Sequence, residues 1–204
     1  MTKWRSALHW STSQVSRTER WKRLGTRGAT VWLTGLSGSG KSSIAKHIEA
    51  DLVEQGTAAY VLDGDNLRHG INDDLGFSRE DRGENARRAA EIAKLFADAG
   101  VVALVALISP YAEDRDRARR LHEEAGLIFL EVYVCTTLAE CESRDPKGLY
   151  AQARAGEVPD FTMVTDPYEP PERPDLVVPT ADGGIDEAAH AVLEELRRRI
   201  ALFA

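Results

Sequence analysis

The stretch GLSGSGKS at residues 35–42 constrains the fold of this chain more than any other feature of the sequence. It fits the pattern G-x-x-x-x-G-K-[ST] in full, follows the apolar run ATVWLT at residues 29–34, and precedes a helical pattern that reaches Gln55. Glycines let successive backbone N–H groups turn inward around an anion, and a helix N-terminus adds partial positive charge. The stretch therefore predicts a buried strand, a phosphate-binding loop and a helix that together bind a nucleoside triphosphate.

The residues of this loop have separable roles in the predicted site. Lys41 is expected to reach the β- and γ-phosphates, and the Ser42 hydroxyl is expected to ligate Mg²⁺. The remaining contacts to the nucleotide should come from the loop backbone and the first helical turn. The predicted nucleotide-binding residues are Gly35, Ser37, Gly38, Ser39, Gly40, Lys41, Ser42 and Ser43.

The rest of the chain alternates between strand-length apolar runs and helical patterns. Such alternation predicts an α/β fold with a mostly parallel sheet and helices on both faces, here the five-stranded sheet of a P-loop NTPase. A long stretch after residue 144 interrupts the pattern with six prolines, which is typical of a working loop. The further predicted strands are residues 57–62, 101–108, 127–134 and 175–178, and the further helices are residues 78–99, 112–125 and 185–202.

Length and composition fit one globular domain. The 204 residues are 43% hydrophobic and 29% charged, and the net charge of -7 argues against a general nucleic-acid or membrane surface. The first 28 residues are polar and basic, so we expect a mobile or docking arm ahead of a domain spanning residues 29–204. They hold no apolar run of the kind that signal peptides and membrane spans need, so we expect a cytoplasmic protein. Two cysteines, Cys135 and Cys141, form no metal-ligand pattern.

The stretch YVLDGDNLRHG at residues 60–70 raises the question of where the acid of the site lies. The run 101–108 ends in Ile108-Ser109-Pro110 and brings no carboxylate, and the N-K-x-D pattern of switch GTPases is absent from the chain. Asp63 follows the preceding strand, and ligands bind at the carboxyl ends of strands in such sheets. Asp63 is therefore a candidate to hold Mg²⁺ or to accept a proton from an attacking hydroxyl. A solvated Asp-Gly-Asp turn remains the alternative.

Several blocks spread along the chain make the resemblance specific. The blocks, in chain order, are WLTGLSGSGKSS, DGDNLRHG, DLGFSREDRGENARR, AKLFADAG, ISPY, DRD, RDPKGLYAQARAGEVPDFT and PYEPP, and the match around them extends from near His9 to about Thr180. Together they resemble adenylyl-sulfate kinases (APS kinases), over nearly the whole chain. The resemblance implies transfer of the γ-phosphoryl group of MgATP to the 3′-hydroxyl of adenylyl sulfate, giving 3′-phosphoadenylyl sulfate and ADP.

The family pattern also implies roles for residues outside the phosphate loop. Phe77 and Phe161 match an aromatic pair that sandwiches the adenine of the substrate. The alternative is that both are ordinary phenylalanines of the hydrophobic core. Arg68, Arg82 and Asn85 match positions that hold the phosphosulfate and ribose, although the arginines alone would suit a solvated face. The catalytic residues implied are Lys41, Asp63 and Ser109, and the substrate-binding residues implied are Asp65, Asn66, Arg68, Phe77, Arg82, Asn85, Ile108, Ser109, Lys147 and Phe161.

Two of these roles need comment. A serine at the position of Ser109 has been proposed in the family as a phosphoryl carrier, but direct in-line transfer explains the same residues without a covalent step. Ser109 is then a hydroxyl that contacts the substrate. The resemblance also implies a lid over about 144–161. Lys147 lies in it, where it would meet the developing charge while the closed lid excludes water. A basic surface loop is the simpler alternative.

The chain departs from the family pattern at a few positions. Where the family usually reads F-T-G-I-D, this chain has Phe161-Thr162-Met163-Val164-Thr165-Asp166, so the aspartate is replaced or displaced. Ala112 stands where an arginine is common, and Thr137 where a proline is usual. These departures concern the lid and the contacts to the ATP base rather than the reaction.

Two other functions remain open from the sequence. The chain could be a P-loop kinase of another small metabolite or nucleotide, or a non-catalytic nucleotide sensor, although a sensor should have lost Lys41, Asp63 or the lid. The family is generally dimeric, so we expect a homodimer, with the basic arm and the apolar face of residues 86–99 as candidate interface. Association with an ATP sulfurylase is left open.

Overall fold

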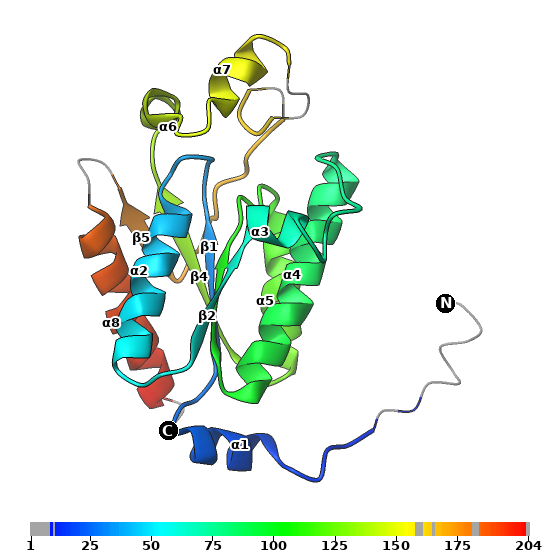
Figure 1. Ribbon diagram of the computed structural model, residues 1–204, viewed down its shortest axis with the longest axis vertical. Helices are drawn as coiled ribbons and strands as arrows, with labels where there is room; N and C mark the ends of the chain where they lie inside the picture. Colours follow the sequence, from blue (N-terminus) through cyan, green and yellow to red (C-terminus); the bar gives the residue numbers. More distant parts are fainter. Residues whose placement is uncertain (1–8, 10, 158–160, 165, 181–183, 203–204) are drawn as a thin grey trace.

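The computed structural model describes residues 9, 11–157, 161–164, 166–180 and 184–202. Their strands form one sheet with the order β2-β3-β1-β4-β5, and all four pairings are parallel, as Figure 1 shows. The predicted α/β fold with a parallel five-stranded sheet is therefore confirmed. The strands are β1 (Ala29–Thr34), β2 (Ala59–Asp63), β3 (Val102–Ala106), β4 (Ile128–Cys135) and β5 (Leu176–Pro179).

Helices cover both faces of the sheet, and two short ones lie beyond its carboxyl edge (Figure 1). The pair α2 and α8 packs on one face and the pair α4 and α5 on the other. Beyond the carboxyl ends of the strands lie α6 and α7, with the described part of the predicted lid; its residues 158–160 lie outside the described residues. None of the helices in the described part of the chain is long and apolar enough to cross a membrane. The helices are α1 (Arg17–Leu24), α2 (Lys41–Glu54), α3 (Gly64–Arg68), α4 (Arg79–Ala99), α5 (Ala112–Glu124), α6 (Leu138–Arg144), α7 (Leu149–Arg154) and α8 (Ile185–Leu202).

The central strand β1 shows why two layers of helices are needed. All six of its residues are buried, and successive side chains point to opposite faces of the sheet. Val31 and Leu33 join the core beneath α2 and α8, whereas Trp32 joins the core beneath α4 and α5. A strand that is apolar on both faces is stable only when both are covered.

Helix α4 approaches the sheet closely because the face it turns inward is made of alanines. Ala86, Ala89, Ala90, Ala93 and Ala97 are all buried in the core that this helix shares with Trp32. The expectation that the apolar face of residues 86–99 serves an interface between subunits is therefore wrong for this alanine stripe. The sheet of the same chain already covers it.

The predicted strand and helix boundaries hold within two residues, and the second and third strands differ most. The run 101–108 was expected to be strand throughout, but β3 ends at Ala106. The backbone of Ser109 adopts a left-handed conformation with φ of 39°, which a strand cannot accommodate. The chain therefore leaves the sheet before the end of its apolar run.

Part of the basic arm is a folded helix that packs on the end of α4. The indole Nε1 of Trp21 donates to the carbonyls of Ala97 and Asp98, at 3.2 Å each. Arg17 and Arg20 both form ion pairs with the Asp98 carboxylate. The last turn of a helix leaves carbonyls without partners inside the helix, and α1 supplies donors to two of them. Between residues 17 and 24 the arm is thus a docked element, not a mobile one.

Replacing Trp21 with alanine should destabilise the protein, because it removes the indole donor together with its packing on Gly100. We expect the free energy of unfolding to fall by about 1–3 kcal/mol in a urea titration. Lys22, exposed on the same helix, is the matched control. Its replacement with alanine should change stability by less than about 0.5 kcal/mol. Equal effects of the two substitutions would show that α1 is not held by Trp21.

Candidate active site

The loop between β1 and α2 has the backbone conformation that its glycines permit. Gly35 and Gly40 have φ values of 150° and 99°, which disfavour any residue with a side chain. A Cβ atom at Gly35 would also lie 2.6 Å from the carbonyl oxygen of Val134, too close for real atoms. The predicted phosphate-binding loop is therefore built as its pattern requires, with its last glycine at the start of α2.

The side chain of Lys41 lies inside this loop and is buried. Its ammonium donates to the carbonyls of Gly35 and Leu36, at 3.0 and 2.6 Å, and lies 3.4 Å from the Ser39 hydroxyl. Burial lowers the pKa of Lys41 to about 8, because the charged form loses hydration. The loop thus holds a desolvated cation at the place where the sequence predicted a phosphate contact.

Ser42, in the first turn of α2, and Asp63, at the end of β2, come together in the structure. The Ser42 hydroxyl donates to Oδ2 of Asp63 at 2.6 Å, while Oδ1 accepts from the backbone N–H of Asp65 at 3.0 Å. The second bond caps α3 and fixes the orientation of the carboxylate. One hydroxyl and one carboxylate suit Mg²⁺, which takes few protein ligands when phosphate oxygens supply others. No cluster of three or more His, Cys, Asp or Glu that could hold a metal occurs among the described residues.

Arginines and an aromatic ring form a wall opposite the loop. Arg68 donates to the carbonyls of Leu75 and Gly76, at 2.9 and 2.7 Å, and its guanidinium lies 4.3 Å from the centre of the Phe77 ring. Arg82 donates through Nε to the Phe77 carbonyl at 2.8 Å. Phe77 is 52% exposed, so its ring is available for stacking. This wall offers positive charge beside a flat apolar surface.

The loop and this wall enclose one cavity of about 280 Å³. Asp63 lines it between the two walls, and Ile108 and Ser109 line its floor at the end of β3. Most of the predicted site residues are therefore brought together. Those that line the cavity are Ser37, Gly38, Gly40, Lys41, Ser42, Ser43, Asp63, Asp65, Arg68, Phe77, Arg82, Asn85, Ile108, Ser109 and Lys147.

Ser109 is held by contacts to both its side chain and its backbone. Its hydroxyl accepts a hydrogen bond from Trp32 Nε1 at 3.1 Å, and its carbonyl accepts one from Arg115 at 2.7 Å. Arg115 is itself buried and paired with Glu131 at 3.0 Å. These contacts fix the left-handed backbone of Ser109 at the floor of the cavity.

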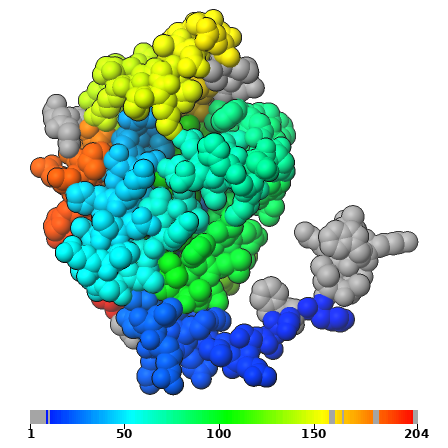
Figure 2. Space-filling model, viewed as in Figure 1, coloured from blue at the N-terminus to red at the C-terminus, as the bar shows by residue number. Residues whose placement is uncertain are grey.

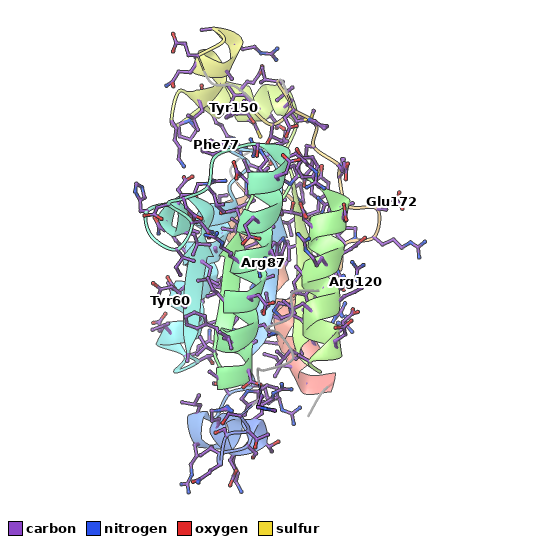
Figure 3. The ribbon with its side chains drawn as sticks, turned by 90° about the vertical axis from the view of Figure 1, so that its right-hand side faces the viewer. Tyr60, Phe77, Arg87, Arg120, Tyr150 and Glu172 are labelled. Carbon is purple, nitrogen blue, oxygen red and sulfur yellow. The ribbon has the colours of Figure 1, made fainter. Side chains whose placement is uncertain are left out.

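The lid lies over the cavity and is bonded to both of its walls. Figure 2 shows the lid, in yellow and yellow-green, resting on the body of the molecule. The Tyr150 hydroxyl donates to the carbonyl of Ser37 in the phosphate loop at 3.0 Å, and Lys147 forms an ion pair with Asp65. Figure 3 shows Tyr150 on the lid and Phe77 at the end of α4 that faces it. The lid in this structure is therefore in contact with the donor and the acceptor sides.

Four of the predicted residues do not line the described cavity, namely Gly35, Ser39, Asn66 and Phe161. Phe161 is only 7% exposed and packs edge-on against Tyr150, with 5.0 Å between ring centres, in a cluster within the lid. It does not line the described cavity, and neither does Asn66, which is exposed on α3. The sandwich of Phe77 and Phe161 therefore stays a prediction.

Sequence reasoning missed Asn72, which positions a predicted residue. Its amide nitrogen donates to Oδ1 of Asn85 at 2.9 Å, and both side chains are buried. That bond directs the amide nitrogen of Asn85 away from Asn72. One asparagine in a polar loop gives no local signal for such a role, because the contact joins residues 13 positions apart.

The fold and the cavity define a P-loop kinase, with a phosphate-binding loop on one wall and an anion-binding wall for a second substrate. Three comparisons give the particular family. The family model for adenylylsulphate kinase matches residues 27–179. An adenylyl-sulfate kinase from Geotalea uraniireducens is 52% identical over 192 residues, which cover 94% of this chain and 91% of the relative.

Two further relatives come from Mycobacterium tuberculosis. The bifunctional enzyme CysN/CysC is 58% identical over 170 residues, which are 83% of this chain but 28% of that enzyme. The solved structure of the APS kinase CysC in complex with AMPPNP and APS is 56% identical, covers 84% of this chain and 99% of its own, and superposes with a TM-score of 0.82. The chain belongs to the adenylylsulphate kinase family.

The turn after the lid contains a residue in a strained conformation. Met163 has a φ of 67° where the family pattern has glycine, and its N–H donates to the Asp166 carbonyl at 2.6 Å. Met163→Gly should raise the free energy of unfolding by about 0.5–1 kcal/mol, because relief of strain outweighs the greater freedom of glycine in the unfolded chain. Met163→Ala keeps the strain and should give no gain. Equal stability of the two variants in urea would contradict this account.

Proposed function

We propose that this protein transfers the γ-phosphoryl group of ATP to the 3′-hydroxyl of adenylyl sulfate, producing 3′-phosphoadenylyl sulfate and ADP. The observation that carries the proposal is the single cavity in which the phosphate loop faces Arg68, Phe77 and Arg82, with Asp63 between them. The donor needs an anion-binding loop, and the acceptor needs cations for its phosphosulfate and a flat surface for its adenine. Both requirements are met across one space.

The donor phosphates bind in the loop at residues 35–42. Backbone N–H groups and the start of α2 attract them, and the Lys41 ammonium exchanges its carbonyl partners for phosphate oxygens. Ser42 and Asp63 are the residues that hold Mg²⁺, which neutralises charge on the phosphates when it is bound. These groups fix the γ-phosphoryl group at the side of the cavity nearest Asp63.

The transfer itself is a direct in-line displacement. The bond from the γ-phosphorus to the bridging oxygen of ADP breaks while a bond from that phosphorus to the 3′-oxygen forms. Asp63 accepts the proton of the 3′-hydroxyl, and Lys41 stabilises charge on the transferred group. Ser109 acts as a contact to the acceptor. Its hydroxyl accepts a hydrogen bond from Trp32 and keeps its O–H as a donor to the acceptor nucleotide.

The acceptor nucleotide lies against the opposite wall. Its adenine stacks on Phe77, with Phe161 as the second ring once the lid has adjusted, and stacking of one base contributes roughly 1–3 kcal/mol. Its phosphosulfate lies among Arg68, Arg82 and Asn85. Asp65 and Asn66 stand on α3 beside the ribose, and Ile108 contributes at the strand end.

The lid completes the site from above. Lys147, paired with Asp65 in this structure, turns to the transferred phosphoryl group when both substrates are bound. The closed lid excludes water, which would otherwise take the phosphoryl group in place of the 3′-hydroxyl. The activity belongs to sulfate activation in the cytoplasm, with a homodimer as the working form and an ATP sulfurylase as a candidate partner. Nucleic acid and membrane are not among its partners.

An ADP-release assay with a panel of acceptors tests the reaction. Adenylyl sulfate should support turnover, and other nucleotides and small metabolites should not. Asp63→Ala should lower kcat by about 10²–10⁴-fold, because the proton acceptor is lost. Asp73→Ala, an exposed carboxylate nearby in the sequence, is the matched control and should leave kcat unchanged. Turnover only with another acceptor would favour the alternative kinase, and no turnover with any acceptor would favour the sensor.

The lowered pKa of Lys41 predicts that nucleotide binding depends on pH. Phosphate oxygens favour the charged amine, so binding should raise the Lys41 pKa above its ligand-free value of about 8. Affinity for MgATP should then be constant below about pH 7 and fall by up to about tenfold per pH unit above pH 8. Calorimetry at about pH 8.5 in buffers of different ionisation enthalpy should show proton uptake on binding. Lys41→Arg keeps the charge and should abolish the uptake. Proton release by the wild type would contradict the assignment.

A further inference from the structure

The turn after the lid places a carboxylate against the acceptor wall. Asp166 stands one residue beyond the position where the family pattern has aspartate, and it is hydrogen-bonded to Phe161 and Met163 through its backbone. Its side chain is only 19% exposed. A largely buried carboxylate is stable only when hydrogen bonds or cations compensate its charge, so its partners show what it does.

The first partner of Asp166 is Tyr111, at the start of α5. The Tyr111 hydroxyl donates to Oδ2 of Asp166 at 2.7 Å, and the guanidinium of Arg79 covers the ring at 3.7 Å from its centre. Burial, and then the bond to Asp166, raise the pKa of Tyr111 to about 12. The phenol therefore remains protonated and donates over the whole working range of pH. The position of the carboxylate is fixed by a rigid, buried ring.

The second partner is Arg82, which lines the cavity. Its Nε lies 3.7 Å from the same Oδ2 atom and 2.8 Å from the Phe77 carbonyl. Arg82 is only 8% exposed, so its orientation has few alternatives. The Phe77 carbonyl and the Asp166 carboxylate both hold the Nε side of the guanidinium.

The positive charge on the acceptor wall explains what the contact between Asp166 and Arg82 does. Arg68 and Arg82 both face the cavity, and burial together with the charge of Arg82 lowers the pKa of Arg68. Two cations that repel each other would move apart in the absence of an anionic ligand. The Asp166 carboxylate, which lies 3.7 Å from Arg82 Nε, offsets this repulsion.

We propose that Asp166 is a positioning residue for the acceptor nucleotide, acting through the guanidinium of Arg82. Tyr111 holds the carboxylate, and the carboxylate holds Arg82 in the orientation that receives the phosphosulfate. Because Asp166 also ends the turn that begins at Phe161, the same contact ties the end of the lid to the acceptor wall. The inference rests on the proposed function, since it assigns a residue to one of its two substrates.

The chain offers a matched control three residues further on. Glu169 accepts a hydrogen bond from the backbone N–H of Ala112 at 2.7 Å, so it ties the same segment to the same end of α5. No described contact joins the Glu169 carboxylate to Arg82. If the segment has a purely structural role, replacing Asp166 or Glu169 should have the same effect on kinetics. If Asp166 positions Arg82, only the replacement of Asp166 should affect acceptor binding.

Steady-state kinetics of Asp166→Asn and Glu169→Gln test the proposal. Asp166→Asn should raise the KM for adenylyl sulfate by about tenfold, because it removes the negative charge of a largely buried ion pair with Arg82. Its kcat and its KM for ATP should stay within about twofold of wild type, because the donor wall is untouched. Tyr111→Phe keeps the ring and should give a smaller rise of the same KM. Glu169→Gln should leave all three constants unchanged.

A double-mutant cycle shows whether Asp166 acts through Arg82. In an Arg82→Ala background, Asp166→Asn should change the KM for adenylyl sulfate by less than about twofold, because its partner is gone. A full tenfold rise in that background would overturn the proposal, as would equal effects of Asp166→Asn and Glu169→Gln. Thermal unfolding of each variant shows that it is folded, and Tyr111→Phe carries the test if Asp166→Asn does not fold.

Wild-type turnover separates the two levels of inference. When the wild type phosphorylates adenylyl sulfate and Asp166→Asn has an unchanged KM, only the positioning role fails. When the wild type does not turn over adenylyl sulfate, the proposed function fails and the positioning role fails with it.

Discussion

The hydrogen bond between Ser42 and Asp63 constrains the structure around it, because Ser42 follows β1 at the start of α2, Asp63 ends β2, and these two strands are not neighbours. β3 lies between β1 and β2, so the two side chains meet over the end of β3. A third strand that continued straight beyond Ala106 would occupy that space. The chain instead leaves the sheet and turns at Ser109, where Arg115 holds the backbone carbonyl. The early end of β3 is therefore the condition for the phosphate loop and the wall of Arg68, Phe77 and Arg82 to share one cavity.

Cations face this cavity from both walls, and backbone carbonyls orient them. Lys41 donates to carbonyls of its own loop, Arg68 to carbonyls of the turn before Phe77, and Arg82 to the carbonyl of Phe77 itself. Carbonyls are neutral acceptors, so they hold each cation without cancelling its charge. The positive potential remains available for two anionic substrates. Asp166 is the exception, since its carboxylate lies beside Arg82 on the side of Nε.

A feature could be predicted from the sequence when it depends mainly on residues that are close together in the chain. The strands, the helices and the phosphate loop were predicted well, because hydrophobic periodicity and glycine spacing are local. Asp63 required one further step, the rule that parallel strands present ligands at their carboxyl ends. The contact of Asn72 with Asn85 and the position of Phe161 inside the lid depend on packing between distant segments, which no local pattern records. The early end of β3 could not be predicted for the same reason, since Ser109 is fixed by Trp32 at its hydroxyl and by Arg115 at its carbonyl.

The two ends of the parallel strands carry different parts of the protein. The cavity and the lid lie at the carboxyl ends of the strands. Helix α1 lies at their amino ends, docked through Trp21 on the last turn of α4 (Figure 1). The start of α1 at Arg17 thus lies at the end of the molecule remote from the lid. A polypeptide, tag or surface linker joined ahead of this helix would leave substrate entry unobstructed. The protein is accordingly suited to immobilisation or fusion on the side of α1, with the opening of its active-site cavity turned toward the solvent.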